Sequence, residues 1–279
     1  MRAARCRVKS SAGGESCALS RAMARAMTPM TDLAHSLRQD GVDVRAAAEC
    51  GIPVTNLPDT VTDSTAELAI GLMLAVSRRI GENSLRAREE APENLFGMGR
   101  SMGRSLRGQT LGLLGCGRIG KRTAEIAAAL GMRCIGYSRH GVNHPQVESV
   151  NLPELLAQSD VLSLHCPLTQ ETRRLLDRSA LARMKQGSIL INTARGAIVD
   201  CDALADTLES GHLRGAGLDV YPDEPHIPPR LIALPQVVLT PHIGTNTQET
   251  RQRMAEECAR QIADALAGKR PAHVVNGIE

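Results

Sequence analysis

The stretch Thr110–Arg139, TLGLLGCGRIGKRTAEIAAALGMRCIGYSR, carries the most information about the fold. Its first part, Leu111–Leu114, is a short apolar run of the kind that forms a buried strand. The sequence GCGRIG follows at 115–120 with the spacing G-x-G-x-x-G. Apolar periodicity then predicts a helix over 118–130, and a second apolar run predicts a strand over 133–137. The pattern as a whole predicts a βαβ unit.

The glycine pattern of this unit is typical of dinucleotide-binding sites. Gly115, Gly117 and Gly120 let the backbone turn tightly and let a pyrophosphate approach the N-terminus of the helix. Free N–H groups and the helix dipole favour an anion there. The motif alone is weak evidence, because it also occurs in loops by chance. Here a strand precedes it and a helix follows it, so the sequence predicts dinucleotide binding.

The end of the second strand bears on the choice of cofactor. An NAD-binding unit usually places Asp or Glu there to hold the ribose 2′-hydroxyl. Here Ser138 stands eighteen residues after Gly120, followed by Arg139 and His140. A serine hydroxyl and an arginine would instead bind a 2′-phosphate. The alternative is that Arg139 is a solvated residue at a strand end. The sequence favours NADP over NAD, with NAD kept as the second possibility.

The composition of the chain limits the class of protein to which it can belong. A chain of 279 residues with 42% hydrophobic and 23% charged residues fits one large or two modest globular domains. The net charge is only +3, and residues 1–30 hold six Arg or Lys against one acid. No basic surface therefore suggests nucleic acid, and no apolar run suggests a membrane. Eight cysteines without a C-x-x-C pair predict reduced thiols and a cytoplasmic protein.

The two ends of the chain differ from its centre. Residues 1–34 are rich in Arg, Ala and Ser, and three interpretations stay open: a targeting peptide, a disordered tail, or sequence upstream of a misassigned start. A short helix is expected over 42–50, and 51–56 reads as a turn and strand. Residues 247–267 have an apolar residue about every fourth position, which predicts a helix. We expect residues 35–66 and 246–279 to form a second domain.

The centre of the chain alternates between strands and helices. Strands are predicted at 110–115, 133–138, 161–165, 188–193, 216–220 and 237–240. Helices are predicted at 118–130, 152–158, 178–185 and 202–211. This alternation predicts an α/β fold with a doubly wound parallel Rossmann-type sheet over 67–245. Ahead of it, Ser64 and Glu67 have capping-box spacing before a long helix ending at Ile80, and 84–108 has low expected order.

Reactive side chains gather after four of the predicted strands. In open α/β sheets, ligands bind at the carboxyl ends of the strands. Each group also has a structural interpretation, such as a turn former, a cap or a loop histidine. Four groups together on one sheet edge favour a site. The four segments are His165–Thr169, Asn192–Gly196, Asp219–Pro225 and Thr240–Gly244.

These segments resemble the D-isomer-specific 2-hydroxyacid dehydrogenases over roughly Asp40 to the C-terminus. The most specific match is MKQGSILINTARGAIVD, Met184–Asp200, and GCGRIG, HCPLTQET, GAGLDVYPDEP and LTPHIG occur in the family's order. The resemblance implies an oxidoreductase that reduces a small 2-oxo acid, such as glyoxylate or hydroxypyruvate, to the D-2-hydroxy acid. It also implies a flavodoxin-like substrate domain and a homodimer formed through the cofactor domain, with the helix from Ser64 as a candidate contact.

The resemblance also assigns roles to residues and implies no metal. Arg195 is similar to the arginine that binds the substrate carboxylate and polarises the 2-oxo group. His242 is similar to the general acid–base, and Glu224 to the acid that pairs with it and raises its pKa. Asp219 matches a position that holds the nicotinamide carboxamide. The other residues implied to line the cofactor are Arg118, Ile119, His165, Cys166, Pro167, Thr172, Thr193, Ala194 and Gly244.

The chain departs from the family near its N-terminus. The family has a glycine-rich turn that binds the substrate carboxylate, and Ser36-Leu37-Arg38-Gln39 stands in that place here. The residues before Asp40 are also too few for the family's first strands. We therefore expect an incomplete substrate domain, weak or no turnover, and early proteolysis of residues 1–34. The second hypothesis is a dinucleotide-binding protein without turnover.

Overall fold

The computed structural model describes residues 42–91, 95–96 and 99–277. The chain divides into two compact units, one formed by Val61–Thr250 and the other by Met1–Thr60 with Arg251–Glu279. The prediction placed these junctions at residues 67 and 245. The predictions for residues 1–34 and for Ser36–Gln39 fall outside the described residues.

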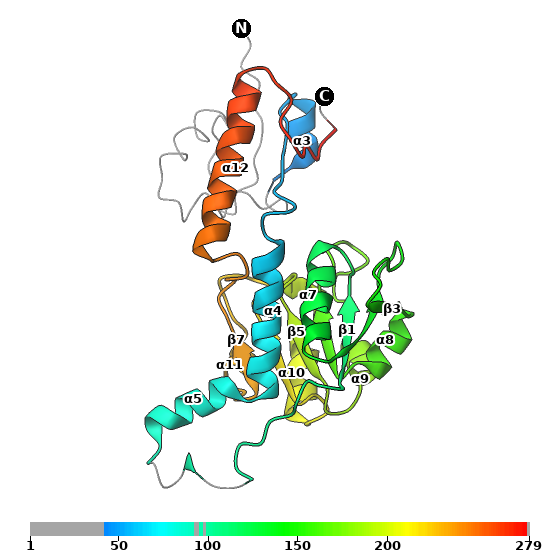
Figure 1. Cartoon of the computed structure of the whole chain (residues 1–279), viewed down its shortest axis with the longest axis vertical. Helices are drawn as coiled ribbons and strands as arrows, with labels where there is room; N and C mark the ends of the chain where they lie inside the picture. The colour runs from blue at the N-terminus through cyan, green and yellow to red at the C-terminus, as the bar shows by residue number, and fades with distance from the viewer. Residues whose placement is uncertain (1–41, 92–94, 97–98, 278–279) are drawn as a thin grey trace. The chain divides into compact units, whose positions relative to one another are not determined.

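The Val61–Thr250 unit is built on a seven-stranded sheet in the order β3-β2-β1-β4-β5-β6-β7 (Figure 1). Every neighbouring pair is parallel, which confirms the predicted doubly wound Rossmann-type sheet. Six of the strands were predicted. The seventh, β3, is only three residues long with one buried side chain, so it left no apolar pattern to read. The strands are β1 (Thr110–Leu114), β2 (Arg133–Tyr137), β3 (Val147–Ser149), β4 (Val161–Leu164), β5 (Ile189–Asn192), β6 (Gly215–Leu218) and β7 (Val237–Leu239).

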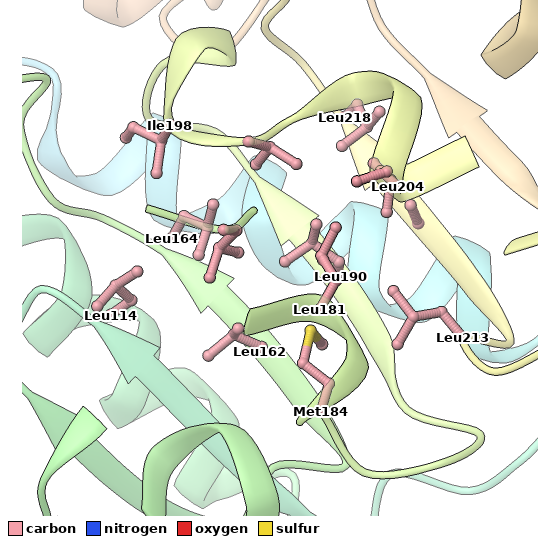
Figure 2. Close-up of a cluster of buried hydrophobic side chains, with 14 of the residues drawn as sticks. Leu114, Leu162, Leu164, Leu181, Met184, Leu190, Ile198, Leu204, Leu213 and Leu218 are labelled. Atoms are coloured by element: carbon pink, nitrogen blue, oxygen red, sulfur yellow. The ribbon is translucent and has the colours of Figure 1, made fainter. Parts of the chain in front are cut away.

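Helices cover both faces of this sheet and enclose a hydrophobic cluster on each. Successive residues of β5 alternate between the clusters, with Ile189 and Ile191 packing toward α4 and α7 and Leu190 packing toward α8, α9 and α10. Figure 2 shows the second of these clusters, which holds Leu162 and Leu204. The helices of this unit are α4 (Thr62–Ser77), α5 (Ile80–Glu89), α7 (Arg118–Ala129), α8 (Leu152–Gln158), α9 (Arg178–Ala182), α10 (Cys201–Glu209) and α11 (Pro229–Ile232), with a short 3₁₀ helix, η2 (Gly196–Ile198).

Helix α4 lies close against β6 because two strand positions are glycine. A Cβ built on Gly215 would lie 2.7 Å from a methyl carbon of Val76, and one built on Gly217 would lie 2.9 Å from the Cβ of Leu72. Real Cβ atoms do not approach that closely, so larger side chains would push the helix off the sheet. The carboxyl end of β6 thereby keeps its place beside β5 and β7.

The start of α4 corrects the predicted capping box. The helix begins at Thr62 with Val61 as its N-cap, two residues before Ser64. The hydroxyls of Ser64 and Thr65 donate back to the Val61 carbonyl at 3.4 and 2.8 Å. Because both residues already lie inside the first turn, Ser64 is not positioned to cap the helix with Glu67.

The end of α4 also differs from the prediction. The long helix was expected to continue to Ile80, but it ends at Ser77 and Arg79 adopts a left-handed conformation with φ 55°. A separate helix, α5, then begins at Ile80 and continues to Glu89, so part of the region of low expected order is helical. No Gly or Pro signals the break, because the left-handed residue is an arginine.

The described residues of the other unit contain two helices and one isolated strand pairing. Helix α3 (Val44–Glu49) is capped by Asp43, whose carboxylate accepts from the Ala46 N–H at 2.9 Å. The long helix α12 (Gln248–Leu266) begins three residues before the boundary at Arg251 and lies mostly in this unit, and an antiparallel bridge joins Thr55 to Val274. Across all the described residues, no helix is both long and apolar enough to cross a membrane.

Candidate active site

The predicted site residues lie on loops at the carboxyl ends of the strands or in the first turn of α7, all within the Val61–Thr250 unit. The chain runs outward from β1 in both directions, to β2 and β3 on one side and to β4 through β7 on the other. Such a reversal of strand order is where open α/β sheets leave a crevice for a ligand.

The glycine turn between β1 and α7 requires glycine at two positions. Gly115 has φ 99°, and a Cβ on it would lie 2.6 Å from the backbone nitrogen of Cys166. A Cβ on Gly120 would lie 2.3 Å from the Gly115 carbonyl oxygen. These close approaches hold the turn against the loop after β4 and bring α7 close to the end of β1.

The same turn fits an anionic cofactor. A Cβ on Gly117 would meet nothing within 4 Å, and Gly117 is the N-cap of α7, with no side chain capping the helix. The first turn of α7, which includes Arg118 and Ile119, therefore presents its N-terminus to open space, where a pyrophosphate is favoured.

Two buried polar atoms nearby have no protein partner among the described residues. They are the Thr193 hydroxyl at the end of β5 and the Nδ1 atom of His165 at the end of β4. Buried polar groups are rarely left unpaired, so these two atoms at the ends of neighbouring strands are suited to hydrogen-bond a ligand. Both residues were predicted to line the cofactor. They fit that role, although the contact itself stays a prediction.

His165 and Cys166, at the start of the loop after β4, are uncharged at neutral pH. Burial lowers the pKa of His165 to about 4, so the imidazole is neutral at pH 7, and its Nε2 lies 2.9 Å from the Ser163 hydroxyl. Burial raises the pKa of the Cys166 thiol to about 11, so it is not a nucleophile at neutral pH. The Thr172 hydroxyl donates to the Pro167 carbonyl at 2.7 Å and holds the loop closed. This side of the site is suited to an uncharged part of a cofactor.

The end of β2 contains an ion pair that the sequence did not reveal. Arg139 lies 2.6 Å from the carboxylate of Glu171, on the loop after β4. Both side chains are mostly exposed, so the pair contributes little to stability. It matters for binding, because a phosphate at Arg139 must compete with Glu171. Ser138 separates this arginine from the end of the strand.

The loops after β6 and β7 bring Glu224 and His242 together. The Glu224 carboxylate oxygens lie 2.8 and 3.0 Å from Nδ1 of His242, and both side chains are about three-quarters buried. A carboxylate at this distance stabilises the imidazolium and fixes the ring orientation. With Nδ1 facing Glu224, Nε2 is the atom suited to exchange a proton with a ligand.

The backbone at His242 is strained. Its φ is 53°, in the left-handed region that residues with a Cβ rarely adopt. Asp219 braces the loop that carries it: the buried carboxylate accepts the Thr240 hydroxyl at 2.7 Å, the Ile243 N–H at 2.8 Å and the Gly244 N–H at 2.9 Å. The contacts of Asp219 are thus with its own chain, and its predicted contact with the nicotinamide stays a prediction.

Arg195 lies in the neighbouring loop, after β5. The buried Asn192 side chain accepts from the Ala194 N–H and donates to the Arg195 carbonyl, both at 3.0 Å. Arg195 itself donates to the Ala194 carbonyl at 2.7 Å. The arginine is therefore held by a braced loop one strand away from the strand that leads to Glu224.

Sequence reasoning gave no role in the site to three residues that lie within the quoted segments and motifs. Glu171 lay inside the quoted HCPLTQET motif, but only the structure shows that it reaches Arg139. Asn192 was weighed as a turn former, and it does brace a turn. Tyr221 gave one usable signal, since it is one of only two tyrosines and follows a buried strand. Its partners are distant in sequence, so its contacts were not readable.

Comparison with known proteins places this site in a family. The model of the "D-isomer specific 2-hydroxyacid dehydrogenase, NAD binding domain" matches residues 70–244, and supports a nicotinamide dinucleotide as cofactor. A glyoxylate reductase of Thermococcus litoralis is 42% identical over 87% of this chain and 75% of its own length. A hydroxypyruvate reductase of Thermotoga maritima is 42% identical over 81% and 74%. The crystal structure of TT0316 protein from Thermus thermophilus has a TM-score of 0.80 and 46% identity over 85% and 76%.

Proposed function

Because the chain belongs to the D-isomer specific 2-hydroxyacid dehydrogenase family, we propose that it reduces a small 2-oxo acid to the D-2-hydroxy acid. The proposed substrates are glyoxylate and hydroxypyruvate, which the names of two similar reductases suggest. The observation that carries the proposal is the His242–Glu224 pair, 2.8 Å apart on the loops beside Arg195.

The chemistry divides among three side chains. Arg195 would bind the substrate carboxylate through its planar fork of N–H donors and draw electron density from the 2-oxo group. His242 would donate a proton from Nε2 to the carbonyl oxygen, and Glu224 would stabilise the imidazolium beforehand. A bound nicotinamide dinucleotide supplies the hydride.

Two measurements test this function separately. Loss of NADPH absorbance in the presence of glyoxylate or hydroxypyruvate reports turnover, and a change in NADPH fluorescence reports binding alone. We expect both signals. Binding without turnover of either acid would contradict the proposal and support the hypothesis of a dinucleotide-binding protein.

We also propose a preference for NADP, supported by Ser138 and Arg139 at the end of β2. Arg139→Ala should weaken NADPH binding about tenfold, the scale of one charge-assisted hydrogen bond, and NADH binding much less. Glu171→Gln should strengthen NADPH binding, because it frees Arg139 from the 2.6 Å ion pair. Kd values from fluorescence titration check both variants.

A matched control for this prediction is Arg174→Ala. Arg174 is as exposed as Arg139 and is paired with Asp200, but it was not predicted to line the cofactor. Its replacement should leave both Kd values unchanged. Equal losses for the two cofactors in Arg139→Ala, or an unmodified protein that prefers NADH, would remove the NADP preference.

We further propose a homodimer whose contact includes α5 and the described residues 95–96 and 99–102. Within the described chain, α5 buries none of its residues. Four large apolar side chains are exposed here: Ile80 at 53%, Leu85 at 59%, Phe96 at 82% and Met102 at 73%. Several large apolar side chains exposed along one segment are typical of an interface, and a second copy is the partner that the family suggests.

The dimer is tested by the mass of the protein in solution. Leu85→Asp should shift the mass measured by light scattering from dimer to monomer, because it places a charge within the proposed contact. Glu49→Ala, a change on exposed α3 far along the chain from this segment, is the control and should leave the mass unchanged. An unmodified protein that is monomeric at micromolar concentration would contradict the proposal.

A further inference from the structure

Tyr221 occupies a junction between the loops of the candidate site. It follows β6, and its side chain is only 5% exposed. Its hydroxyl donates to the carbonyls of Thr240 at 2.9 Å and Leu218 at 3.1 Å. Burial raises the pKa of this phenol to about 12, so it remains a donor at neutral pH.

The Tyr221 hydroxyl is connected to His242 through the carbonyl of Thr240. The same oxygen accepts the backbone N–H of His242 at 3.1 Å, across the turn at Pro241. Fixing this carbonyl therefore fixes the turn that leads into His242. That turn needs support, because His242 has φ 53°.

The backbone of Tyr221 reaches the other member of the pair. Its N–H donates to Oε1 of Glu224 at 3.2 Å. The same carboxylate lies 2.8 Å from Nδ1 of His242. One residue thus holds the carboxylate through its N–H and the histidine turn through its hydroxyl.

The loop that carries Arg195, the third side chain of the site, also contacts Tyr221. A Cβ on Gly196 would lie 2.0 Å from the Tyr221 carbonyl carbon, so the two backbones are in direct contact. Gly196 immediately follows Arg195. The loop that carries Arg195 therefore packs directly on the backbone of Tyr221.

We propose that Tyr221 is a positioning residue for the reaction, acting through His242 and Glu224 rather than on the substrate. This inference rests on the proposed function. The hydroxyl keeps the Thr240 carbonyl, and with it His242, in the orientation that meets the Glu224 carboxylate.

The hydroxyl can be removed without leaving a carbonyl unpaired. In Tyr221→Phe the Thr240 carbonyl keeps the His242 N–H, and the Leu218 carbonyl keeps the Thr240 N–H at 2.9 Å. The phenyl ring still fills the same core position. The variant should therefore fold, and its effect should appear in the alignment of the pair.

We expect Tyr221→Phe to lower kcat about tenfold, since small misplacements of a catalytic group have effects of that size or more. The Kd for NADPH should not change. The control is Thr207→Val on α10, which removes another hydroxyl that donates to two carbonyls, at 3.2 and 2.8 Å, away from the site. Thr207→Val should keep its kcat, and the two variants should lose similar amounts of thermal stability.

A second measurement does not depend on turnover. The His242–Glu224 hydrogen bond should give a downfield proton resonance in the NMR spectrum, identified by its loss in Glu224→Gln. Tyr221→Phe should shift or broaden this resonance, and Thr207→Val should not. If the resonance and kcat are both unchanged in Tyr221→Phe, the positioning role is wrong. A different outcome separates this inference from the proposed function. If the unmodified protein does not turn over a 2-oxo acid, but Tyr221→Phe still shifts or broadens the resonance, the proposed function is wrong and the positioning of the His242–Glu224 pair by Tyr221 is supported.

Discussion

Replacing His242 by alanine should lower kcat by about 10²–10⁴-fold, the usual contribution of a positioned proton donor. The imidazole is the group that would protonate the carbonyl oxygen through Nε2. Glu224 lies 2.8 Å from Nδ1, on the opposite side of the ring, so it cannot replace the imidazole as the proton donor. NADPH affinity should stay nearly unchanged, because the glycine turn and the β2 end lie on other loops. Stopped-flow or steady-state NADPH oxidation gives kcat, and fluorescence titration gives the Kd.

The matched control is His226→Ala. His226 lies on the loop after β6, two residues past Glu224, where it is 3.6 Å from the Asp223 carboxylate and 81% exposed. It shares the chemistry of His242 without the burial, so its loss should leave kcat unchanged. A near-normal rate in His242→Ala would mean that this histidine is structural only.

Gly196→Ala should have the largest effect on stability. The added Cβ would lie 2.0 Å from the Tyr221 carbonyl carbon and 2.4 Å from the Pro222 nitrogen, both backbone atoms that cannot rotate away. Relieving the clash requires the loops after β5 and β6 to separate, at a cost of about 3 kcal/mol in the free energy of unfolding. Arg195 would move with its loop, so turnover should be lost as well.

Chemical denaturation measures this cost, with Gly71→Ala as the control. Gly71 lies inside α4, where an added Cβ meets nothing within 4 Å. Alanine there should raise the free energy of unfolding by about 0.5–1 kcal/mol, because glycine is the poorer helix former. Opposite signs for the two alanines are the expected result. A Gly196→Ala protein as stable and active as the original would show that these loops are not in fixed contact.

The sheet was predictable because its strands are buried on both faces. Runs such as Ile189–Ile191 are apolar throughout, and their length and spacing predicted the order of elements. The glycine turn was predictable for a related reason, since a G-x-G-x-x-G between strand and helix has few other uses. The Glu224 and His242 roles came from a family resemblance. Nothing in their spacing showed that they would meet.

The parts that were missed depend on contacts between distant residues. Arg79, two residues after the end of α4, has a left-handed conformation without being a glycine; its local partners are Glu82, which accepts from its guanidinium, and Asn83, whose side chain donates to its carbonyl. Ser64 looked like a cap because capping boxes are recognised from spacing, yet the helix starts two residues earlier. Tyr221 touches Thr240, nineteen residues away, and that pairing exists only in the folded sheet. Local patterns contain none of this information.

The backbone of His242 has a consequence for the protein under selection. His242 has a left-handed backbone conformation. A residue with a Cβ in that conformation lowers the stability of the fold by about 1–2 kcal/mol, whereas glycine adopts it without this cost. A library screened only for thermal stability or expression should therefore enrich glycine, or asparagine, at position 242. A library screened for 2-oxo acid reduction should keep histidine despite that cost. Different residues enriched at position 242 in the two screens would show that this position is selected for activity at the expense of stability.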